Sequence, residues 1–437
     1  MFAKLKRSAE GARVPHRKGT SDLATVKMPL PTKVVLPMQQ HIGAPCTPAV
    51  KKGDRVYVGT VVGKAGGFVS ADIHSGVSGT VEAIDSVHMP NGAHVPAVVI
   101  VPDGSQTPDP ALQAPQVTDA KSLADAARAC GLVGLGGAGF PTAVKLSPKD
   151  LSAIDTLIIN GAECEPYITA DNREFLECSD TVMRGVKAVK ELLGIKNVVF
   201  GIERNKPQAI DLMFSLTKGD ADYAVHPLDS RYPQGAEKVL IEQVTGREVP
   251  RGGLPSDVSV IVMNVTTVST LGKYLDTGMP LTTKRLTVDG DAVNQAKNVE
   301  VVIGTPIEEV LEFCGGVKDD FAKLLMGGPM MGTAVADLQS PVLKQNNALL
   351  CLSEKAAALP APGPCIRCGR CIEACPMGLS PVEIAGAFQK GNVEGLNEMM
   401  VDLCIGCGCC TFVCPAKRPV CQTMNLAKVM QKKGGGK

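Results

Sequence analysis

The sequence contains no tryptophan, and aromatic residues make up only 3% of its 437 residues. This scarcity argues against stacking platforms for nucleic-acid bases. A formal net charge of +1 also provides no global positive field for a polyanion. No run of 18 uninterrupted apolar residues is present, and no apolar stretch follows the basic N-terminus. The sequence therefore predicts neither a membrane-spanning helix nor a secretory leader.

Disulfides are not expected either, although the chain contains sixteen cysteines. Without a secretory leader, these cysteines are assigned to a reducing cytoplasm, where thiols bind metals more often than they pair. The six histidines show no metal-binding spacing. The candidate metal ligands are therefore cysteines.

Eight cysteines form two copies of the pattern Cys-x-x-Cys-x-x-Cys-x-x-x-Cys-Pro. The first copy comprises Cys365, Cys368, Cys371 and Cys375, and the second comprises Cys404, Cys407, Cys410 and Cys414. Two-residue gaps let one turning backbone place three thiolates on three iron corners, and the fourth cysteine of each copy ligates the other cluster. We therefore predict two [4Fe–4S] clusters, with Cys414 completing the first ligand set and Cys375 completing the second.

Two zinc sites are the alternative interpretation of these motifs. Zinc needs four thiolates per site, but it explains neither the doubled spacing nor the proline after each fourth cysteine. Among the other eight cysteines, Cys164 is a candidate for a site because it lies in a charged loop. The rest are expected to be buried small residues.

The N-terminal part of the chain divides into two segments. Residues 1–29 form a basic tail with little apolar content, which predicts either disorder or a contact with anionic lipid or a partner. Residues 30–115 are rich in valine, glycine and proline and predict short strands of a small β barrel or sandwich. They resemble the barrel-sandwich fold of biotinyl and lipoyl carriers. The turn at residues 71–73 has no lysine to modify, which favours a scaffold.

Residues 116–280 predict an α/β domain. Strands are expected at 156–160, 197–202, 223–227 and 258–264, and helices after residue 119 and near 182–193, 207–216 and 235–244. This alternation indicates a mainly parallel sheet covered by helices.

Two further segments complete the chain. Residues 281–348 predict a small α+β module in which Thr305 caps a helix. Residues 349–437 carry the cysteine motifs, and the connecting stretches at 381–388 and 393–400 are expected to be helical.

A glycine-rich loop lies at residues 131–145. The spacing of Gly134, Gly136 and Gly139 matches a dinucleotide fingerprint, but the preceding element is expected to be a helix rather than a strand. Glycines let backbone N–H groups approach an anion, and Lys145 adds positive charge. The loop therefore predicts a phosphate site. A flexible turn between helices is the alternative.

A second loop, Asn160-Gly-Ala-Glu163-Cys-Glu165-Pro, follows the first strand expected in the α/β segment. Open α/β sheets bind ligands at the carboxyl ends of their strands. Two carboxylates beside an amide suit the hydroxyls of ribityl or ribose groups. A solvated acidic loop is the alternative.

These two loops, together with Tyr232-x-x-Gly235-x-Glu237 and Asn264-Val-Thr-Thr267, resemble the flavin-binding subunit of respiratory complex I, which oxidises NADH with FMN. From about residue 30 to 425 the chain resembles more closely the C subunit of the Rnf complex, the membrane-bound ferredoxin:NAD⁺ oxidoreductase. That family implies a barrel-sandwich domain, a Rossmann-like parallel α/β flavin domain, a β-grasp domain and an α-helical two-cluster ferredoxin domain.

The resemblance also implies a set of cofactor contacts. It implies non-covalent FMN with its phosphate near Gly136, Gly137, Lys145, Asn264 and Thr267, and with flavin or ribityl contacts from Asn160 and Glu163. It implies nicotinamide-nucleotide contacts from Phe140, Glu165 and Tyr232. The expected cofactor-binding set is completed by Gly134, Gly139, Gly235 and Glu237.

The chain departs from the complex I pattern at three positions. That pattern has arginines where this chain has Val133 and Leu135, and a glutamate where it has Ala236. These changes leave the phosphate cradle intact and alter the expected NADH contacts.

The resemblance implies an oxidoreductase subunit that passes electrons between NAD(H), FMN and two clusters, toward or from ferredoxin, within a complex that translocates Na⁺ or H⁺. A hydride carries two electrons and a cluster accepts one, so flavin must stand between them. The implied partners are the integral membrane and ferredoxin-like subunits of that complex. The implied location of the subunit is peripheral, on the cytoplasmic face of the inner membrane.

Two alternative functions remain open. One is a soluble flavin and iron–sulfur reductase, such as the cobalamin reductase of propanediol utilisation, in which the barrel-sandwich unit comes after the flavin domain. The other is an electron-wiring subunit without nucleotide binding.

Overall fold

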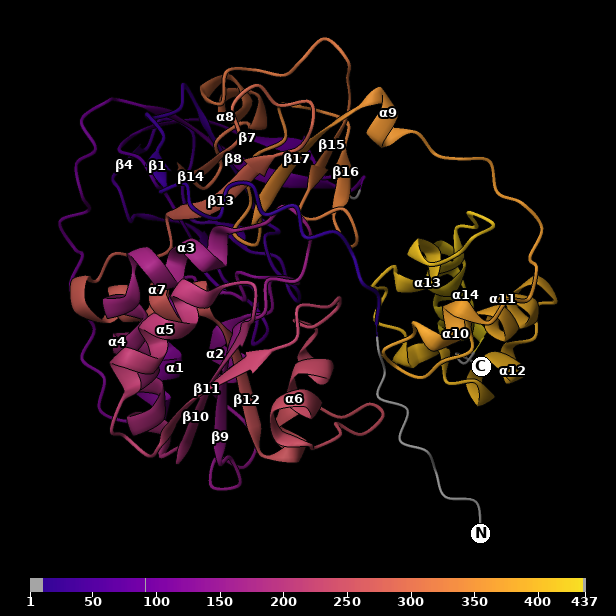
Figure 1. Ribbon diagram of the computed structural model, residues 1–437. Coiled ribbons are helices and arrows are strands. Elements are labelled where there is room, and N and C mark those ends of the chain that lie inside the picture. The colour runs from indigo at the N-terminus through magenta and orange to yellow at the C-terminus, as the bar shows by residue number, and fades with distance from the viewer. Residues whose placement is uncertain (1–10, 91, 435–437) are drawn as a thin grey trace.

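The computed structural model describes residues 11–90 and 92–434. Figure 1 shows three sheet-containing parts packed together and a helical C-terminal part reached through an extended linker. The predicted multidomain mixture of sheets and helices is therefore observed.

The first part consists of two small antiparallel sheets. One has the order β2-β8-β7-β4 and the other the order β3-β5-β6. Their strands are β2 (Val34–Pro37), β3 (Thr47–Pro48), β4 (Arg55–Val56), β5 (Val61–Lys64), β6 (Ile73–His74), β7 (Gly79–His88) and β8 (His94–Pro102). In the turn before β6 the Asp72 carboxylate accepts hydrogen bonds from Lys64 Nζ at 2.6 Å and from the Ala65 N–H at 2.8 Å. This turn is locked by its own polar contacts, as a scaffold requires.

The second part is a parallel sheet of order β11-β10-β9-β12. Leu157 and Ile159 of β9 pack into the large core under α1, α4 and α7, whereas Ile158 packs against α6 on the other face. The strands are β9 (Thr156–Gly161), β10 (Asn197–Glu203), β11 (Tyr223–Leu228) and β12 (Val260–Asn264). The helices are α1 (Ala120–Ala129), α2 (Thr142–Lys145), α3 (Ala170–Glu177), α4 (Ser179–Leu193), α5 (Pro207–Thr217), α6 (Glu237–Thr245), α7 (Val265–Thr277) and the 3₁₀ turn Pro255–Val258. The expected alternation of strands and helices is confirmed.

The third part is a mixed sheet of order β1-β14-β13-β17-β15-β16. Its elements are β1 (Val26–Lys27), β13 (Thr283–Asp289), β14 (Lys297–Val302), α8 (Ile307–Phe313), β15 (Phe321–Met326), β16 (Thr333–Val335) and β17 (Ala348–Ser353). The predicted cap of α8 is wrong. The Thr305 hydroxyl donates to the Val302 carbonyl at 2.8 Å, and the N-cap residue is Pro306. The threonine closes the turn after β14 instead of the helix.

The expectation of a disordered tail is wrong for residues 11–29. Ala12 exchanges two backbone hydrogen bonds with Tyr232, at 2.7 and 3.0 Å, and β1 pairs in parallel with β14. Between these two anchors, the Lys18 ammonium donates to the carbonyls of Glu163, Glu165 and Ile168 at 2.5–2.8 Å. We call residues 11–27 the N-terminal strap. The basic residues at positions 4, 6 and 7 lie outside the described residues.

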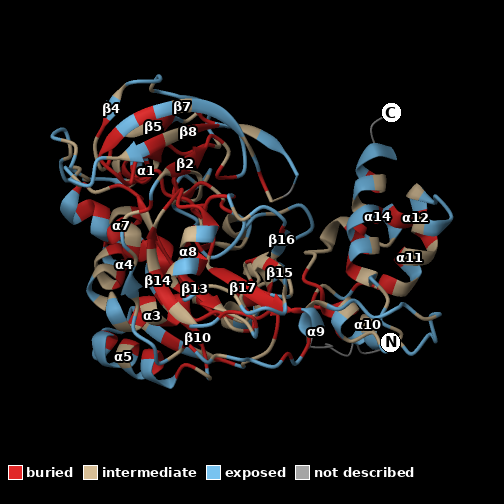
Figure 2. Cartoon of the chain, turned by 90° about the horizontal axis from the view of Figure 1, so that it is seen from above, coloured by how far each residue is buried: buried red, intermediate tan, exposed pale blue. Residues whose placement is uncertain are grey.

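The C-terminal part is helical, as expected for the stretches around the cysteine motifs. It contains α10 (Arg370–Glu373), α11 (Pro381–Gln389), α12 (Val393–Glu398), the 3₁₀ turn Val401–Leu403, α13 (Cys409–Phe412) and α14 (Val420–Gly434). The short helix α9 (Glu354–Ala357) precedes the linker and lies on the mixed sheet, where the Lys323 ammonium donates to the Ala357 carbonyl at 3.1 Å. A core that includes Ile384, Leu396 and Met424 joins α11, α12 and α14. Figure 2 shows these helices as a separate body with its own buried faces.

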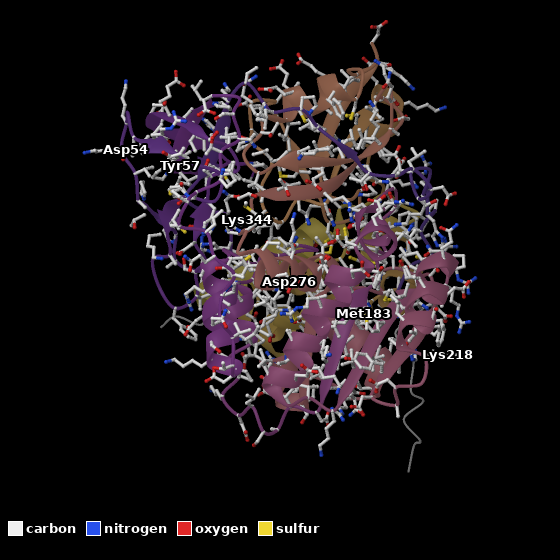
Figure 3. All side chains as sticks on the ribbon, turned by 90° about the vertical axis from the view of Figure 1, so that its left-hand side faces the viewer. Asp54, Tyr57, Met183, Lys218, Asp276 and Lys344 are labelled. Atoms are coloured by element: carbon white, nitrogen blue, oxygen red, sulfur yellow. The ribbon has the colours of Figure 1, made fainter. Side chains whose placement is uncertain are left out.

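A buried lysine joins the three sheet-containing parts. Lys344 lies just before β17, and its ammonium donates to the carbonyl of Asp72 at 2.5 Å and to that of Gly131 at 2.7 Å. In Figure 3 its label lies where the three parts meet. Burial lowers the pKa of Lys344 to about 8, because a charged ammonium is unfavourable away from water. The hydrogen bonds to the two carbonyls offset this desolvation cost.

No helix in the described part of the chain combines the length and the hydropathy that a membrane span requires.

Two glycines bring α4 and α7 into backbone contact. A Cβ atom at Gly185 would lie 2.0 Å from the Val268 carbonyl oxygen, and one at Gly272 would lie 2.2 Å from that of Thr181. These distances are far below van der Waals contact, so the two helices can approach this closely only without side chains at these positions. The Arg184–Asp276 ion pair at 2.7 Å spans the same two helices at the surface.

We expect Gly272→Ala to lower the melting temperature of the sheet-containing parts. Alanine is the better helix former by about 1 kcal/mol, but overpacking against a backbone carbonyl costs about 1–3 kcal/mol and outweighs that gain. Thermal unfolding followed by circular dichroism measures the shift. The matched control is Gly386→Ala in α11, where a Cβ would meet nothing within 4 Å. An unchanged melting temperature in Gly272→Ala would show that the helices separate freely.

Candidate functional site

The glycine-rich loop lies at the carboxyl edge of the parallel sheet. The Gly134 N–H donates to the Phe140 carbonyl at 2.9 Å, which closes the loop, and Gly139 adopts a positive φ of 66°. Gly136 and Gly137 are exposed, and a Cβ at Gly137 would meet nothing within 4 Å. The loop therefore presents exposed backbone at its tip, as the phosphate prediction requires.

Asn264 and Thr267 support this loop from the N-terminus of α7. The Leu135 N–H donates to the Thr267 hydroxyl at 2.9 Å, and Asn264 caps α7 by accepting from the Thr267 N–H. A Cβ at Gly136 would lie 2.4 Å from the Asn264 amide nitrogen, so a side chain there would displace the Asn264 amide from its capping position. The helix that directly follows the loop, α2, has only four residues. The long helix whose start lies beside the loop is α7.

A second lysine lies beneath the loop. The buried ammonium of Lys284, in β13, donates to the Leu135 carbonyl at 2.9 Å. Burial lowers its pKa to about 8, and nearby Asp171 and Glu174 act in the opposite direction. A cation in this position adds positive potential under the loop. Lys284 was not among the residues expected at this site. Its place on one strand face with the apolar Leu286 and Val288 was a usable signal.

Lys145 forms an ion pair with Glu237 across the same edge of the sheet. The two charged groups are 2.6 Å apart, and the ammonium also donates to the Val262 carbonyl at 3.2 Å. Both side chains are partly exposed, so the pair contributes little to stability. An anion bound at the loop tip would compete with Glu237 for this ammonium.

The Asn160 loop lies at the end of the neighbouring strand. Asn160 pairs with Asn264 in register between β9 and β12, and its amide donates to the Gly235 carbonyl at 3.0 Å. Gly235 itself must be glycine, because a Cβ there would lie 2.3 Å from the Ala162 carbonyl oxygen. The structure therefore brings the Asn160, Gly235 and Asn264 segments together, as predicted.

Glu163 has one carboxylate oxygen without a partner. Its Oε1 accepts from the Asp171 N–H at 2.7 Å, whereas its buried Oε2 accepts no hydrogen bond. Burial raises the pKa of Glu163 to about 7, although Lys18 and Lys206 act to lower it. A buried unpaired carboxylate oxygen is costly unless a further donor satisfies it. This residue therefore fits a site for a ligand that can donate a hydrogen bond.

Glu165 holds a loop of the mixed sheet. Its carboxylate accepts from the N–H groups of Met330 and Met331 at 3.0 and 2.8 Å. Burial raises its pKa, and these two N–H groups lower it again. The expected contact between Glu165 and a nicotinamide nucleotide would have to replace or share these bonds.

The fit of the whole edge to FMN can be judged from its atoms. It offers exposed loop backbone, two lysines of which one lies under the loop, a capped helix start and an unpaired buried carboxylate oxygen. Amide donors and cations suit a phosphate, and carboxylate and amide acceptors suit ribityl hydroxyls. The residues present therefore fit this cofactor. Val133 and Leu135 are buried in the core instead of facing the edge.

Tyr232 lies between this edge and the cysteine runs. Its ring is buried, and burial raises its pKa, an effect that the nearby Glu165 carboxylate reinforces. An apolar cluster joins it to the N-terminal strap and to the second cysteine run, with members Ala12, Val14, Ala374, Cys407 and Cys409 and with Cys164 and Met330 packed against them. The Cys409 thiol donates to the Tyr232 carbonyl at 3.6 Å.

Cys164 behaves as a structural thiol. Its sulfur accepts from the Gly235 N–H at 3.4 Å, and burial raises its pKa to about 12. A thiol that stays protonated is neither a nucleophile nor a ready metal ligand.

The two cysteine runs meet in the way that crossed ligation requires. A small cavity is lined by Cys375 of the first run together with Cys404, Cys407 and Cys410 of the second. On the other side, burial raises the pKa of Cys371, and the neighbouring thiols of Cys368, Cys365 and Cys414 act in the same direction. In the described residues no three such side chains converge tightly enough to chelate a single metal ion. A four-iron cluster binds one thiolate per iron and spreads its ligands farther apart than zinc does.

Four family models match the chain in consecutive order. They are the RnfC barrel sandwich hybrid domain at residues 6–105, the Nuo51 FMN-binding domain at 127–273, the SLBB domain at 285–334 and the 4Fe-4S dicluster domain at 360–415. The predicted barrel-sandwich, flavin and two-cluster modules are confirmed, and the dicluster match argues against zinc.

Solved structures share this fold. The chain is similar to a chain of the NAD⁺-reducing [NiFe]-hydrogenase in its air-oxidised state, with a TM-score of 0.50 and 16% identity, and in its H₂-reduced state, with 0.51 and 15%. Each match covers 72% of this chain, and 62% and 63% of the hydrogenase chains. The chain thus spans less than two thirds of the hydrogenase chains that it matches.

Three curated relatives match over most of their length. The C subunit of the Na(+)-translocating ferredoxin:NAD(+) oxidoreductase complex of Acetobacterium woodii is 41% identical over 389 residues, which cover 87% of each chain. Its proton-translocating counterpart in Clostridium ljungdahlii is 40% identical, covering 87% of this chain and 84% of the relative. The C subunit of the ion-translocating oxidoreductase complex of Rhodobacter capsulatus is 39% identical, covering 94% and 80%. The family that the sequence resembles is thereby confirmed: the chain belongs to the C subunits of ion-translocating ferredoxin:NAD⁺ oxidoreductase complexes.

Proposed function

We propose that this chain passes electrons between NAD(H), FMN and two [4Fe–4S] clusters, toward or from ferredoxin, as a subunit of a membrane complex that translocates Na⁺ or H⁺. The observation that carries the proposal is the contact between the FMN-binding domain and the second cysteine run, through Tyr232 and Cys409. Electron transfer needs this proximity. The names of the relatives support the same activity.

Each cofactor has a defined place in the proposal. FMN, when bound, converts the electron pair of a hydride into single-electron steps. Gly136, Gly137 and Gly139 would hold its phosphate by backbone N–H groups. Gly134 would shape the loop through its own bond to Phe140, and Lys145, Asn264 and Thr267 would close that cradle. Asn160, Glu163, Gly235 and Glu237 lie toward the ribityl side.

The nucleotide side rests on Phe140 and on Tyr232, whose buried ring would have to be uncovered to reach a nucleotide. Glu165 acts mainly as the anchor of the 327–332 loop. This last assignment differs from the nucleotide contact that the resemblance implies, because both Glu165 oxygens already accept backbone N–H groups. The buried Val133 and Leu135 supply no charge to a nucleotide. Tight NADH binding therefore depends on the aromatic residues and the loop backbone.

The domain boundaries that we propose are 30–115, 116–280, 281–348 and 349–437, after a segment at 1–29. In fold terms these are a barrel-sandwich, a Rossmann-like α/β domain, a β-grasp domain and a helical ferredoxin domain. The order matters, because the barrel-sandwich match precedes the FMN-binding match. This order favours the Rnf-type subunit over the soluble cobalamin reductase.

The first prediction concerns the crossed ligands. The protein purified without oxygen should hold about eight irons. Cys375→Ala should abolish the cluster of the 404–410 run while the cluster of the 365–371 run survives, as resolved by electron paramagnetic resonance and iron analysis. The matched control is Cys421→Ala, which removes a thiol that lines the same cavity off the ligand spacing. Loss of only the 365–371 cluster in Cys375→Ala contradicts the crossing, and zinc in place of iron contradicts both sites.

The second prediction concerns FMN. Lys145→Glu removes a charge-assisted hydrogen bond to the phosphate, worth about 1.5–3 kcal/mol, and adds repulsion, so we expect flavin affinity to fall by at least about tenfold. Flavin fluorescence released from the purified variant measures the loss, and both clusters should remain. Lys149→Glu changes an exposed lysine four residues away and should keep its flavin. Full flavin content in Lys145→Glu would place the cradle elsewhere.

The third prediction concerns the membrane. A subunit held peripherally on the cytoplasmic face should pellet with native membranes and move to the supernatant when the integral subunits are deleted. Contacts between subunits that have an apolar core should survive a high-salt wash, because salt weakens interactions between exposed charges and not apolar packing. The screening length for such charges is about 8 Å at physiological ionic strength. Immunoblots of both fractions measure the distribution. A soluble protein in cells with intact integral subunits would favour the free reductase.

A further inference from the structure

The N-terminal strap crosses the carboxyl edge of the parallel sheet. After β9 the Tyr167 N–H donates to the His16 carbonyl at 3.0 Å. The ring nitrogens of His16 lie 3.3 Å from the Ser230 carbonyl after β11 and 3.3 Å from the Asn205 amide after β10. Open α/β sheets bind their ligands at this edge. The strap therefore lies at the edge where the proposed cofactor site is built.

Lys18 holds the loop that follows β9. An ammonium has three N–H donors, and those of Lys18 reach the carbonyls of Glu163, Glu165 and Ile168 at 2.8, 2.8 and 2.5 Å. Burial lowers the pKa of Lys18 to about 8, and the neighbouring Lys206 acts in the same direction. With all three donors used, Lys18 has none left for a ligand. It can act on the site only through the loop that it holds.

The loop that Lys18 holds carries the carboxylate with an unpaired oxygen. Glu163 Oε1 accepts from the Asp171 N–H at 2.7 Å, and the buried Oε2 has no partner. The Asp171 carboxylate in turn accepts from the Asn264 amide at 2.7 Å. That amide lies against Gly136 of the glycine-rich loop. The Glu163 carboxylate is therefore connected to the glycine-rich loop through Asp171 and Asn264.

Glu163 lies among buried charges from several elements. Burial raises its pKa to about 7, and the ammonium of Lys18 counteracts this rise more than that of Lys206 does. Lys206 is already paired with Glu203, at 2.8 Å. The other charged groups near Glu163 are Asp171 in α3 and Lys284 in β13. Lys18 is therefore the main cation that keeps Glu163 ionised near neutral pH.

We propose that Lys18 is a positioning residue of the FMN site, which fixes the Glu163–Ile168 loop and keeps the Glu163 carboxylate charged, with its unpaired oxygen available to a ribityl hydroxyl. The inference rests on the proposed function and adds to that site a residue from outside the FMN-binding domain. A charged carboxylate accepts a stronger hydrogen bond from a hydroxyl than a neutral carboxyl group does. Lys18 thus acts on FMN through Glu163, without touching the cofactor.

The test measures the dissociation constant of FMN from the full chain by flavin fluorescence, across neutral pH. Wild-type affinity should fall as the pH drops through about 7, because Glu163 then takes up a proton. In Lys18→Met this fall should occur at higher pH, and the affinity at neutral pH should be at least about tenfold weaker. Lys18→Arg keeps the charge and should keep the wild-type pH profile. The matched control is Lys27→Met, an exposed lysine of the same strap, which should match the wild type.

A double-mutant cycle with Glu163→Gln tests whether Lys18 acts through Glu163. The loss of affinity caused by Lys18→Met should be smaller in the Glu163→Gln background than in the wild type, because the two residues are coupled. Lys18→Gln is neutral but keeps a donor for the carbonyls, so it provides the same test if Lys18→Met does not fold. Hydrogen exchange at residues 160–168 of the flavin-free chain should become faster in the neutral variants, which reports on the loop without any cofactor.

Three results would overturn the role of Lys18 alone while FMN still binds the wild type. They are a wild-type affinity and pH profile in the neutral Lys18 variants, equal losses from Lys18→Met with and without Glu163→Gln, and an equal loss in Lys27→Met. A wild-type chain that binds no FMN would contradict the proposed function and this inference together.

Discussion

The arrangement of this chain depends on a buried ammonium at the point where three of its parts meet. Lys344 leaves the mixed sheet and donates to the Asp72 carbonyl of the barrel-sandwich and the Gly131 carbonyl that precedes the glycine-rich loop. A Cβ at Gly131 would lie 2.3 Å from the Asp72 oxygen, so both segments close around one charge. Removing a buried cation from its carbonyls leaves unsatisfied acceptors, which cost about 1–3 kcal/mol each. The position of the loop is therefore set both by α7 within the FMN-binding domain and by lysines from outside it.

A similar dependence on distant contacts extends from the loop toward the cysteines. The N-terminal strap holds the Glu163–Ile168 carbonyls through Lys18, and Glu165 in turn holds the Met330 loop, which reaches Gly408. The chain thus links the Asn160 loop to the second cysteine run by short polar contacts and one apolar cluster. The exposed linker of residues 358–369 adds little to this connection (Figure 2). Docking of the helical part depends instead on Tyr232 and its neighbours and on the ion pair of Arg251 with Asp402, at 2.6 Å.

The sequence predicted what is encoded by local spacing. Both cysteine runs, the alternating α/β segment and the two loops at its edge follow from residues close together in the chain. Contacts between distant residues escaped prediction: Lys18 lies 145 residues from Glu163, and β1 pairs with a strand near residue 300. A basic segment with few apolar residues is predicted to be disordered because it contains no core of its own. Residues 11–27 are ordered because carbonyls from residues 163–168 bind Lys18. Thr305 shows the opposite case. A local pattern predicted that it caps a helix, but its hydroxyl instead bonds to the Val302 carbonyl in the turn after β14.

The central claim is that FMN stands between the nucleotide and the clusters. Anaerobic rapid mixing of the purified chain with NADH tests it most directly, with flavin bleaching followed by absorbance and cluster reduction by freeze-quench electron paramagnetic resonance. The account predicts that the flavin bleaches first, that the clusters are reduced afterwards, and that protein stripped of flavin shows no cluster reduction until FMN is restored. Reduction of the clusters at an unchanged rate without flavin, or no reduction by NADH of the flavin-loaded chain, would contradict it.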